Sequence, residues 1–339
     1  MQPTMIGLDI AKNVFQLHAE DGSGGVLRKR LGRNALEVFF AKQAPAVVGI
    51  EACGSSHHWA RTLSALGHTV RLIPAGYVKP FVKRNKTDAR DAEAICEAMQ
   101  RPNMRSVPMK SVEQQAARGL ETARDLLVRQ RTQLMNSIRG LLAEHGVIAA
   151  QGLKGFGVLR GKIEAGDPEI HPLLLPALRA LLEQWHQAGT ASEQLEDQLV
   201  SRARSDATIR RLTTIPGIGP LTAHAIVAAI GDGRQFSSGR DFAAWAGLTP
   251  REHQSANRRR EGSISRQGDG GVRRLLTLGA SALLRQLRIK PERASPWVRG
   301  ILARRPMKVA VVAQAAKNAR IAWAMLRSGQ PYRAAGAQA

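Results

Sequence analysis

The sequence predicts an N-terminal α/β domain followed by two mainly helical regions. Short strand and helix patterns alternate up to about residue 108, long amphipathic helical patterns fill 109–205, and a basic helical region with glycine-rich turns follows. A chain of 339 residues exceeds what one hydrophobic core usually fills, so two or three domains are expected. We place them at 1–108, 109–205 and 206–328, with a disordered tail at 329–339.

The first domain is expected to contain a mixed sheet with helices on both faces. Three consecutive strand patterns open it, and helices and strands then alternate. The expected strands are at 4–10, 14–20, 26–31, 46–52 and 69–75, and the expected helices are near 35–42, near 58–66 and at the segment that carries Asp88 and Asp91.

Four acidic residues occupy special places in this pattern. Asp9 and Glu51 each close a strand, while Asp88 and Asp91 share one face at the start of a helix. Carboxylates that lie close together repel one another, so a group of four is usually stabilised by a divalent cation with oxygen ligands. The four acids therefore predict a Mg²⁺ site with the layout of a ribonuclease-H-like nuclease core. Each acid alone is also compatible with a solvated surface charge or, for Asp88, a helix-terminal charge.

The charge balance indicates a polyanionic partner. The chain has 50 Lys and Arg against 27 Asp and Glu, a net charge of +23, and residues 206–339 alone carry 23 basic against 7 acidic residues. Such a protein is expected to bind nucleic acid, mainly through its C-terminal part. With 4% aromatic residues, base stacking cannot dominate binding. The absence of a long uncharged apolar run excludes membrane insertion.

The cysteines and one histidine pair receive structural interpretations. Cys53 and Cys96 are too few for a disulfide framework and lack metal-ligand spacing, so we expect a reducing cytoplasm and two small apolar packing residues. His57 and His58 are expected as a surface pair at a helix start rather than as metal ligands.

The second region is expected to form an antiparallel helical hairpin. Apolar residues recur with three-four spacing over 112–141 and 174–199, on either side of a Gly-rich break at 152–166. Such stripes most often pack into a core. Two long seams with little else to cover them also favour a coiled coil that forms a dimer or tetramer of the chain.

The third region opens with LTTIPGIGPLTAHAIVAAIGD, residues 212–232. Gly217 and Gly219 lie in a tight turn between two short helices, where backbone N–H groups at the second helix start can meet a phosphate. This pattern predicts a helix-hairpin-helix that binds the nucleic-acid backbone without reading sequence. The alternative is a structural turn between packed helices.

A polar loop is expected between a helix that ends at Leu248 and one that begins near Gly271. It holds three serines among many arginines, and a guanidinium group near a phosphate can stabilise the charge that develops when a serine hydroxyl attacks. A serine in such a place is by default a phosphate contact. The serines are Ser255, Ser263 and Ser265, and the residues expected to contact nucleic acid are Gly217, Gly219, Arg251, Arg258, Arg259, Arg260, Arg266, Arg273 and Arg274.

Together these residues resemble a known family. The four acids, followed by PGIGPLTA and then by GLTP, a serine, G-x-ISRQGD and RRLL, resemble the DEDD transposases of bacterial insertion sequences. This is the insertion-sequence one-ten group, which includes the Piv-type DNA invertases and RNA-guided recombinases, and the similarity covers nearly the whole chain. It implies a RuvC-like domain in which Asp9, Glu51, Asp88 and Asp91 bind Mg²⁺, with Mn²⁺ expected to substitute. A coiled coil then leads to a transposase domain with a catalytic serine.

The resemblance also implies a reaction and partners. Ser255 aligns with the family's serine nucleophile, which cuts one DNA strand and holds its end as a phosphoserine ester, so that strands can be rejoined without ATP. The acids of one subunit and the serine of another would form a composite site. Donor and target DNA, a guide noncoding RNA from the element and a homo-oligomer are the implied partners, in the bacterial cytoplasm and nucleoid.

Two other interpretations differ in their chemistry. A RuvC-like junction endonuclease would use metal-activated water and form no protein–DNA adduct. An architectural nucleic-acid-binding protein would show no Mg²⁺-dependent cleavage, although the four acids, all in place, disfavour it.

Overall fold

The computed structural model describes residues 4–83, 87–255 and 258–333, with only the backbone for residues 253–255 and 258–261. Its internal contacts divide the chain into two compact units, Met1–Glu113 and Gln114–Ala339. Each unit is described by itself.

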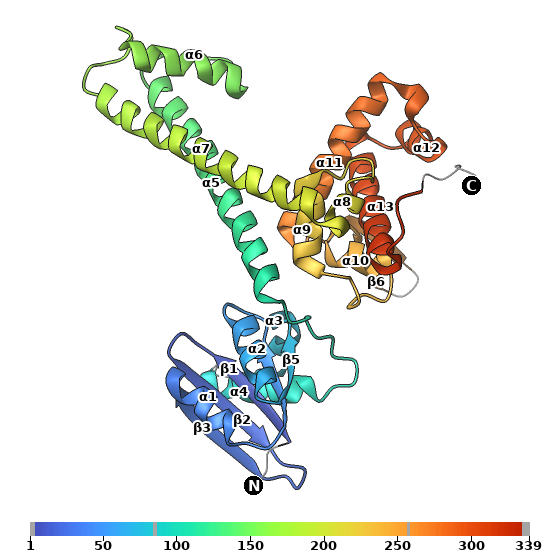
Figure 1. The fold of residues 1–339 in the computed structure, drawn as a ribbon. Coiled ribbons are helices and arrows are strands. Elements are labelled where there is room, and N and C mark those ends of the chain that lie inside the picture. Colours follow the sequence, from blue (N-terminus) through green and yellow to red (C-terminus); the bar gives the residue numbers. More distant parts are fainter. Residues whose placement is uncertain (1–3, 84–86, 256–257, 334–339) are drawn as a thin grey trace. The chain divides into compact units, whose positions relative to one another are not determined.

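A five-stranded mixed sheet forms the centre of the first unit (Figure 1). Its order is β3-β2-β1-β4-β5, in which β1, β2 and β3 pair antiparallel while β4 pairs parallel with both β1 and β5. The strands are β1 (Met5–Ile10), β2 (Val14–Glu20), β3 (Val26–Gly32), β4 (Val47–Glu51) and β5 (Thr69–Ile73). All five lie where the sequence predicts strands, so the predicted mixed sheet is confirmed.

Helices cover both faces of this sheet, as predicted. Helices α1 (Arg33–Ala41) and α2 (Ser56–Ala65) pack on the face where Ile6 and Leu8 of β1 are fully buried. Helix α4 (Asp88–Met99) covers the opposite face. A short helix α3 (Ala75–Val78) and a 3₁₀ turn η1 (Lys79–Phe81) precede it in the chain.

Two glycines allow α4 to lie directly against the sheet. A Cβ atom at Gly7 would stand 2.1 Å from the carbonyl oxygen of Ala92, and one at Gly49 would stand 2.7 Å from a side chain of the same helix. Successive side chains of a strand point to opposite faces. Asp9 and Glu51, two residues after these glycines, therefore point to the face that α4 covers.

Two long helices, α5 (Val112–Ala143) and α7 (Leu175–Ser205), run antiparallel. The Arg124 guanidinium lies 2.5 Å from Glu196, and that of Arg131 lies 3.6 Å from Glu193. Residue numbers therefore fall along α7 as they rise along α5. The predicted antiparallel helical hairpin is confirmed.

The expected Gly-rich break at 152–166 is wrong, because Gly152–Ala165 forms helix α6. One of its glycines serves packing: a Cβ atom at Gly155 would stand 1.8 Å from the carbonyl oxygen of Ala150. The buried side chains of α6 join those of α5 and α7 in one apolar core. Tertiary packing thus overrides the low helix propensity of glycine.

The rest of the second unit is a helical core with one β-hairpin. Its helices are α8 (Ala207–Leu212), α9 (Pro220–Ile230), α10 (Gly239–Trp245), α11 (Gly270–Ile289), the 3₁₀ turn η2 (Pro291–Arg293), α12 (Pro296–Arg304) and α13 (Met307–Ser328). In the described ranges, no helix is both long and apolar enough to cross a membrane. Of the predicted tail, residues 329–333 form neither helix nor strand, and 334–339 lie outside the described residues.

The polar loop expected after Leu248 is wrong in form, since an antiparallel hairpin occupies that segment. Strand β6 (Pro250–Ser255) pairs with β7 (Arg258–Ile264). The sequence of both strands is mostly polar, so neither shows the alternation of apolar and polar residues by which a strand is recognised. The hairpin is therefore defined by its backbone pairing, and no pattern of apolar residues predicts it.

Replacing Gly7 with alanine tests the close packing of α4. Gly7→Ala should lower the free energy of unfolding by about 1–3 kcal/mol or more, because the methyl group would overlap the backbone of α4. Urea unfolding of the full chain measures it. Gly22→Ala is the matched control, since a Cβ atom at Gly22 meets nothing within 4 Å, and its effect should stay within about 0.5 kcal/mol. Equal effects of the two changes would contradict the packing argument.

Candidate metal centre and serine hairpin

Three of the four predicted acids come together at the end of β1. One carboxylate oxygen each from Asp9, Asp88 and Asp91 lies within 4.8 Å of the other two. Asp88 and Asp91 stand in the first turn of α4, whose positive end favours negative charge. The macrodipole alone does not explain Asp9, which comes from the sheet. The cluster joins two elements that are far apart in the chain.

The fourth acid, Glu51, ends the neighbouring strand β4. The parallel register pairs Leu8 with Ile50, so Asp9 and Glu51 are the next residues on adjacent strands and share a sheet face. Glu51 is not among the three acids whose oxygens lie within 4.8 Å of one another. Burial raises the pKa of the Cys53 thiol, and the charges of Glu51 and Asp9 raise it further. The charges of both acids are therefore close to the same thiol, that of Cys53.

The donor atoms of this cluster suit a hard divalent cation. Three carboxylates offer only oxygen, and Asp88 is exposed while Asp9 and Asp91 are half-buried, so an ion and a phosphate can reach them. The chemistry of the donors fits the Mg²⁺ that the sequence predicts.

The two histidines at the start of α2 differ in their surroundings, and His57 has a structural role. His57 Nδ1 accepts a hydrogen bond from the backbone N–H of Lys110 at 3.2 Å, and Arg61 donates to the carbonyl oxygen of Lys110 at 2.7 Å. Burial, with the positive charges of Lys110 and Arg61, lowers the pKa of His57 to about 4, so its ring is neutral at pH 7. The expected surface pair is correct for exposed His58 and wrong for half-buried His57, which anchors the segment after α4.

The two cysteines also differ from each other. Cys96 is fully buried, as expected of a packing residue. Cys53 is exposed, so the same expectation is wrong for it. The turn between β4 and α2 leaves its side chain at the surface, next to the acids of the strand ends.

The predicted turn between two short helices is present at 213–219, between α8 and α9. Gly217 has φ of +85°, a conformation that favours glycine, and its carbonyl oxygen would lie 1.9 Å from a Cβ atom at Gly279 of α11. Asn318 donates to the carbonyl oxygen of Pro216 at 3.0 Å. Gly217 therefore packs inward. A Cβ atom at Gly219 would meet nothing within 4 Å, so the space beside this residue is open.

The hairpin that carries Ser255 is held firmly at its base. Arg266, in the left-handed region with φ of +57°, donates its N–H to the carbonyl oxygen of Gly247 at 3.2 Å. A Cβ atom at Gly268 would stand 1.7 Å from the carbonyl oxygen of Trp245, so only glycine allows this approach. Arg273 donates to two backbone carbonyls of the same region, at 2.8 and 3.2 Å. These contacts fix where the hairpin leaves the helical core.

The structure describes the side chains of some of the residues that are predicted to contact nucleic acid. Arg251 donates to the carbonyl oxygen of Ser265 at 3.1 Å, and Arg274 forms an ion pair with Asp125. Ser255 is the last residue of β6 and pairs with Arg258. The side chains of Ser255, Arg258, Arg259 and Arg260 lie outside the described residues, so their roles stay predictions.

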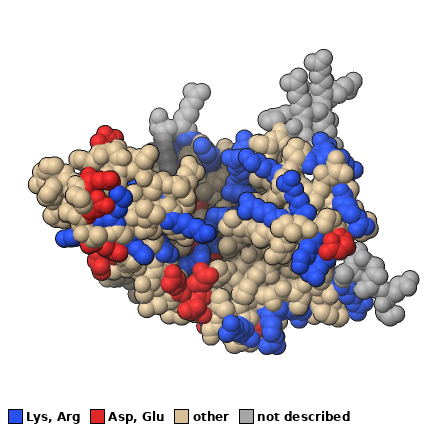
Figure 2. Space-filling model, turned by 90° about the horizontal axis from the view of Figure 1, so that it is seen from above, with Lys and Arg blue, Asp and Glu red and all other residues tan. Residues whose placement is uncertain are grey.

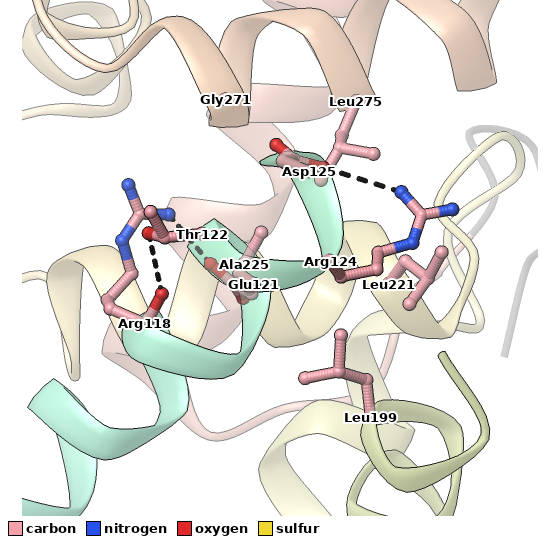
Figure 3. A pocket seen from close by; sticks show the side chains of 10 residues that line it. All are labelled: Arg118, Glu121, Thr122, Arg124, Asp125, Leu199, Leu221, Ala225, Gly271 and Leu275. Carbon is pink, nitrogen blue, oxygen red and sulfur yellow. Dashed lines mark hydrogen bonds and ion pairs between the residues drawn. The ribbon is translucent and has the colours of Figure 1, made fainter. Parts of the chain in front are cut away.

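An ion-pair network joins α5 to α9 and α11 within the second unit. Figure 3 shows Arg118 and Glu121, the residues that α5 contributes to it. Arg118 donates to Glu121 at 2.7 Å and to Asp269 at 2.5 Å, and Glu121 in turn lies 2.6 Å from Nδ1 of His224. Asp269 also accepts from the N–H of Val272 at 2.9 Å, which caps α11 just after the hairpin. Sequence reasoning missed this network because its partners are 103 and 151 residues apart in the chain.

Comparisons with known proteins agree with this arrangement. A model described as the Transposase IS116/IS110/IS902 family matches residues 209–295, which include the turn of Gly217 and the serine hairpin. A transposase model of the DEDD IS110 type matches residues 6–146, which include all four acids. Both matched segments thus belong to transposases, enzymes that move DNA.

Whole-length relatives support the same conclusion. A "Probable family 20 transposase" of Pseudomonas aeruginosa is 47% identical over 98% of this chain and 99% of its own length. The "Transposase for insertion sequence element IS1328" of Yersinia enterocolitica is 40% identical over 97% of this chain and 98% of its own. A "Pilin gene-inverting protein" of Moraxella bovis is 43% identical over 70 residues, 20% of this chain and 22% of its own length. The chain belongs to the IS110 family of DEDD transposases, as its resemblance predicts, and is a DNA transposase or recombinase.

Removing Glu121 tests the network that joins α5 to α9 and α11. Glu121→Ala should lower the free energy of unfolding by about 1–3 kcal/mol, because it leaves His224, with 2% of its side chain exposed, without its carboxylate partner. Urea unfolding of the full chain measures the change. Glu183→Ala, an exposed position on α7, should change stability by no more than about 0.5 kcal/mol. If Glu121→Ala were as mild as this control, the network would contribute little to the fold.

Proposed function

We propose that the protein cleaves and rejoins DNA with a divalent-metal centre at Asp9, Glu51, Asp88 and Asp91 and with Ser255 as nucleophile. The observation that carries the proposal is the meeting of three carboxylates, from β1 and α4, within 4.8 Å. The mixed sheet, with acids at the ends of two adjacent parallel strands and on the facing helix, supports a ribonuclease-H-like, RuvC-like domain.

Mg²⁺ is the proposed cofactor, with Mn²⁺ able to replace it. Asp9, Asp88 and Asp91 would hold the ion, and Glu51 from the neighbouring strand would be a further ligand. When bound there, the ion supplies a Lewis acid that polarises a phosphoryl oxygen. The rigid contact of α4 with the sheet keeps the carboxylates in place before substrate arrives.

Ser255 is the proposed nucleophile. Its Oγ would form a bond to phosphorus as the bond to the leaving sugar oxygen breaks, and the proton of the hydroxyl passes to that oxygen or to solvent. The resulting phosphoserine ester keeps the energy of the phosphodiester, so the reverse attack by a sugar hydroxyl rejoins strands. The fixed hairpin base, and the many arginines of β7, support a site that orients and neutralises a phosphate.

We further propose a homo-oligomer with composite sites, in which the acids of one subunit act with the serine of another. Helices α5 and α6 carry exposed apolar side chains that suit a second copy of the chain in a coiled coil, among them Leu126, Leu153 and Val158. A stable shared site would then require assembly before cleavage. Assembly in this way prevents single subunits from cutting DNA.

Nucleic-acid binding is proposed to rest on charge. The net charge is +23, and Figure 2 shows Lys and Arg spread widely over the displayed face, with Asp and Glu in a few smaller groups. The open space beside Gly219, at the start of α9, supports a helix-hairpin-helix contact with a phosphate. The guide RNA that the family resemblance implies would pair with donor and target DNA and so supply the sequence reading.

The acidic centre is tested by Asp88→Asn. Removing one charge from the cluster should reduce Mg²⁺-dependent strand cleavage by about 10²-fold or more, while DNA binding stays near wild type because the basic surface is unchanged. Cleavage is measured on supercoiled DNA that carries the element ends, with any guide RNA supplied. Glu37→Gln, at an exposed position on α1, is the control and should cleave normally. Normal cleavage by Asp88→Asn would refute the assignment.

The nucleophile is tested by Ser255→Ala. This variant should form no protein–DNA adduct on denaturing gels, while Ser263→Ala should form the adduct at the wild-type level. An adduct that persists in Ser255→Ala would move the assignment to Ser263 or Ser265. Mg²⁺-dependent cleavage without any adduct in the wild-type protein would instead favour attack by water, as in a junction endonuclease.

A further inference from the structure

A second group of potential metal ligands lies on the same side of the sheet as the acidic centre but at a different place. His18, Glu20 and Cys96 each offer a ligand atom, and these three atoms lie within 4.8 Å of one another. Cys96 follows Asp88 by eight residues in α4, which is about 12 Å along a helix axis. The two clusters are therefore separate sites on one helix.

The sheet register explains why the three residues meet. In the antiparallel pair of β1 and β2, His18 lies opposite Gly7 and Glu20 lies opposite Met5. Directly opposed residues share a sheet face, and Gly7 is in contact with α4 close to Cys96. His18 and Glu20 therefore project toward α4, where Cys96 meets them.

These three side chains differ in burial. Cys96 is fully buried and His18 has 3% of its surface exposed, whereas the Glu20 side chain is 27% exposed. His18 Nε2 lies 3.1 Å from Glu20 Oε1, and the other oxygen of Glu20 accepts from Gln100 at 2.9 Å. The second ring nitrogen of His18 faces the Arg28 guanidinium at 3.5 Å. A nitrogen, a sulfur and an oxygen thus converge on one point that solvent reaches through Glu20.

We propose that His18, Glu20 and Cys96 form a zinc site that ties β2 to α4. Imidazole, thiolate and carboxylate are all ligands of Zn²⁺, and the partly exposed side of Glu20 leaves room for water as a fourth ligand. Mg²⁺ prefers oxygen ligands and water, so it is directed to the acidic centre instead. On binding, the thiol proton passes to solvent and a metal–sulfur bond replaces it.

The zinc site would stabilise the helix that carries Asp88 and Asp91. Sheet and helix already meet through the contacts of Gly7 and Gly49 with α4. A metal bridge adds a bond between β2 and the third turn of the same helix, while the acids occupy its first turn. The site is structural and independent of the proposed cleavage reaction.

Cobalt binding tests the proposal with a readout that the acidic centre cannot give. Metal-free protein in excess Mg²⁺, which fills the carboxylate site, is titrated with Co²⁺. A cobalt–thiolate bond produces a sulfur-to-metal charge-transfer absorption band, and oxygen ligands do not. We expect the band to saturate at one equivalent, to disappear when Zn²⁺ is added, and to remain in Asp88→Asn.

The two cysteines of the chain provide matched variants. Cys53→Ser changes an exposed residue and leaves Cys96 as the sole thiol, so the band should persist in this variant, and Cys96→Ser should abolish it. Glu20→Gln should weaken Co²⁺ binding by about tenfold or more. A Cys53→Ser protein that is folded by circular dichroism but shows no band would overturn the proposal. Unchanged affinity in Glu20→Gln would overturn the three-ligand assignment.

Discussion

The direct contact between α4 and the sheet is the constraint on which the first unit depends. Because Gly7 and Gly49 carry no side chain, the helix backbone reaches the strands, and its first turn arrives at the strand ends. The acidic cluster is a consequence of this packing. Asp9 lies two residues after Gly7 in the same strand, so its side chain points to the sheet face that α4 covers. An acid site built in this way is placed by rigid elements, so little reorganisation is needed when a cation binds.

Glycines also allow close backbone contacts in the second unit. Gly268 and Gly279 allow backbone to touch backbone, at the hairpin base and at the turn of Gly217. Around them, Asp269 caps α11 and pairs with Arg118 of α5. Motif residues that a sequence suggests for phosphate binding thus also hold the scaffold. Arg273 and Arg274 illustrate this, because the structure gives both of them protein partners.

Sequence patterns predicted the elements that have a strong period and missed those that lack one. All five strands of the first unit were predictable from apolar runs, and the long helices from their three-four spacing. Helix α6 was missed because its glycines suggested a break, and the hairpin of Ser255 because its strands are polar. Three acids were predictable as a cluster from strand ends and helix spacing. The link between Glu121 and His224 was not, since no local rule joins residues 103 positions apart.

The separation of the two chemical groups follows from this architecture. The acids belong to the first unit and Ser255 to the second, each fixed by its own core. Under the proposed mechanism neither unit can complete strand transfer by itself, because the carboxylates would hold the cation that polarises the phosphate while the hydroxyl would form the covalent bond. A surface with an excess of positive charge binds any nucleic acid, so charge alone gives no control over where cutting occurs. In the proposed mechanism, dividing the reacting groups between two compact units would make cleavage depend on correct assembly on DNA, which would restore that control.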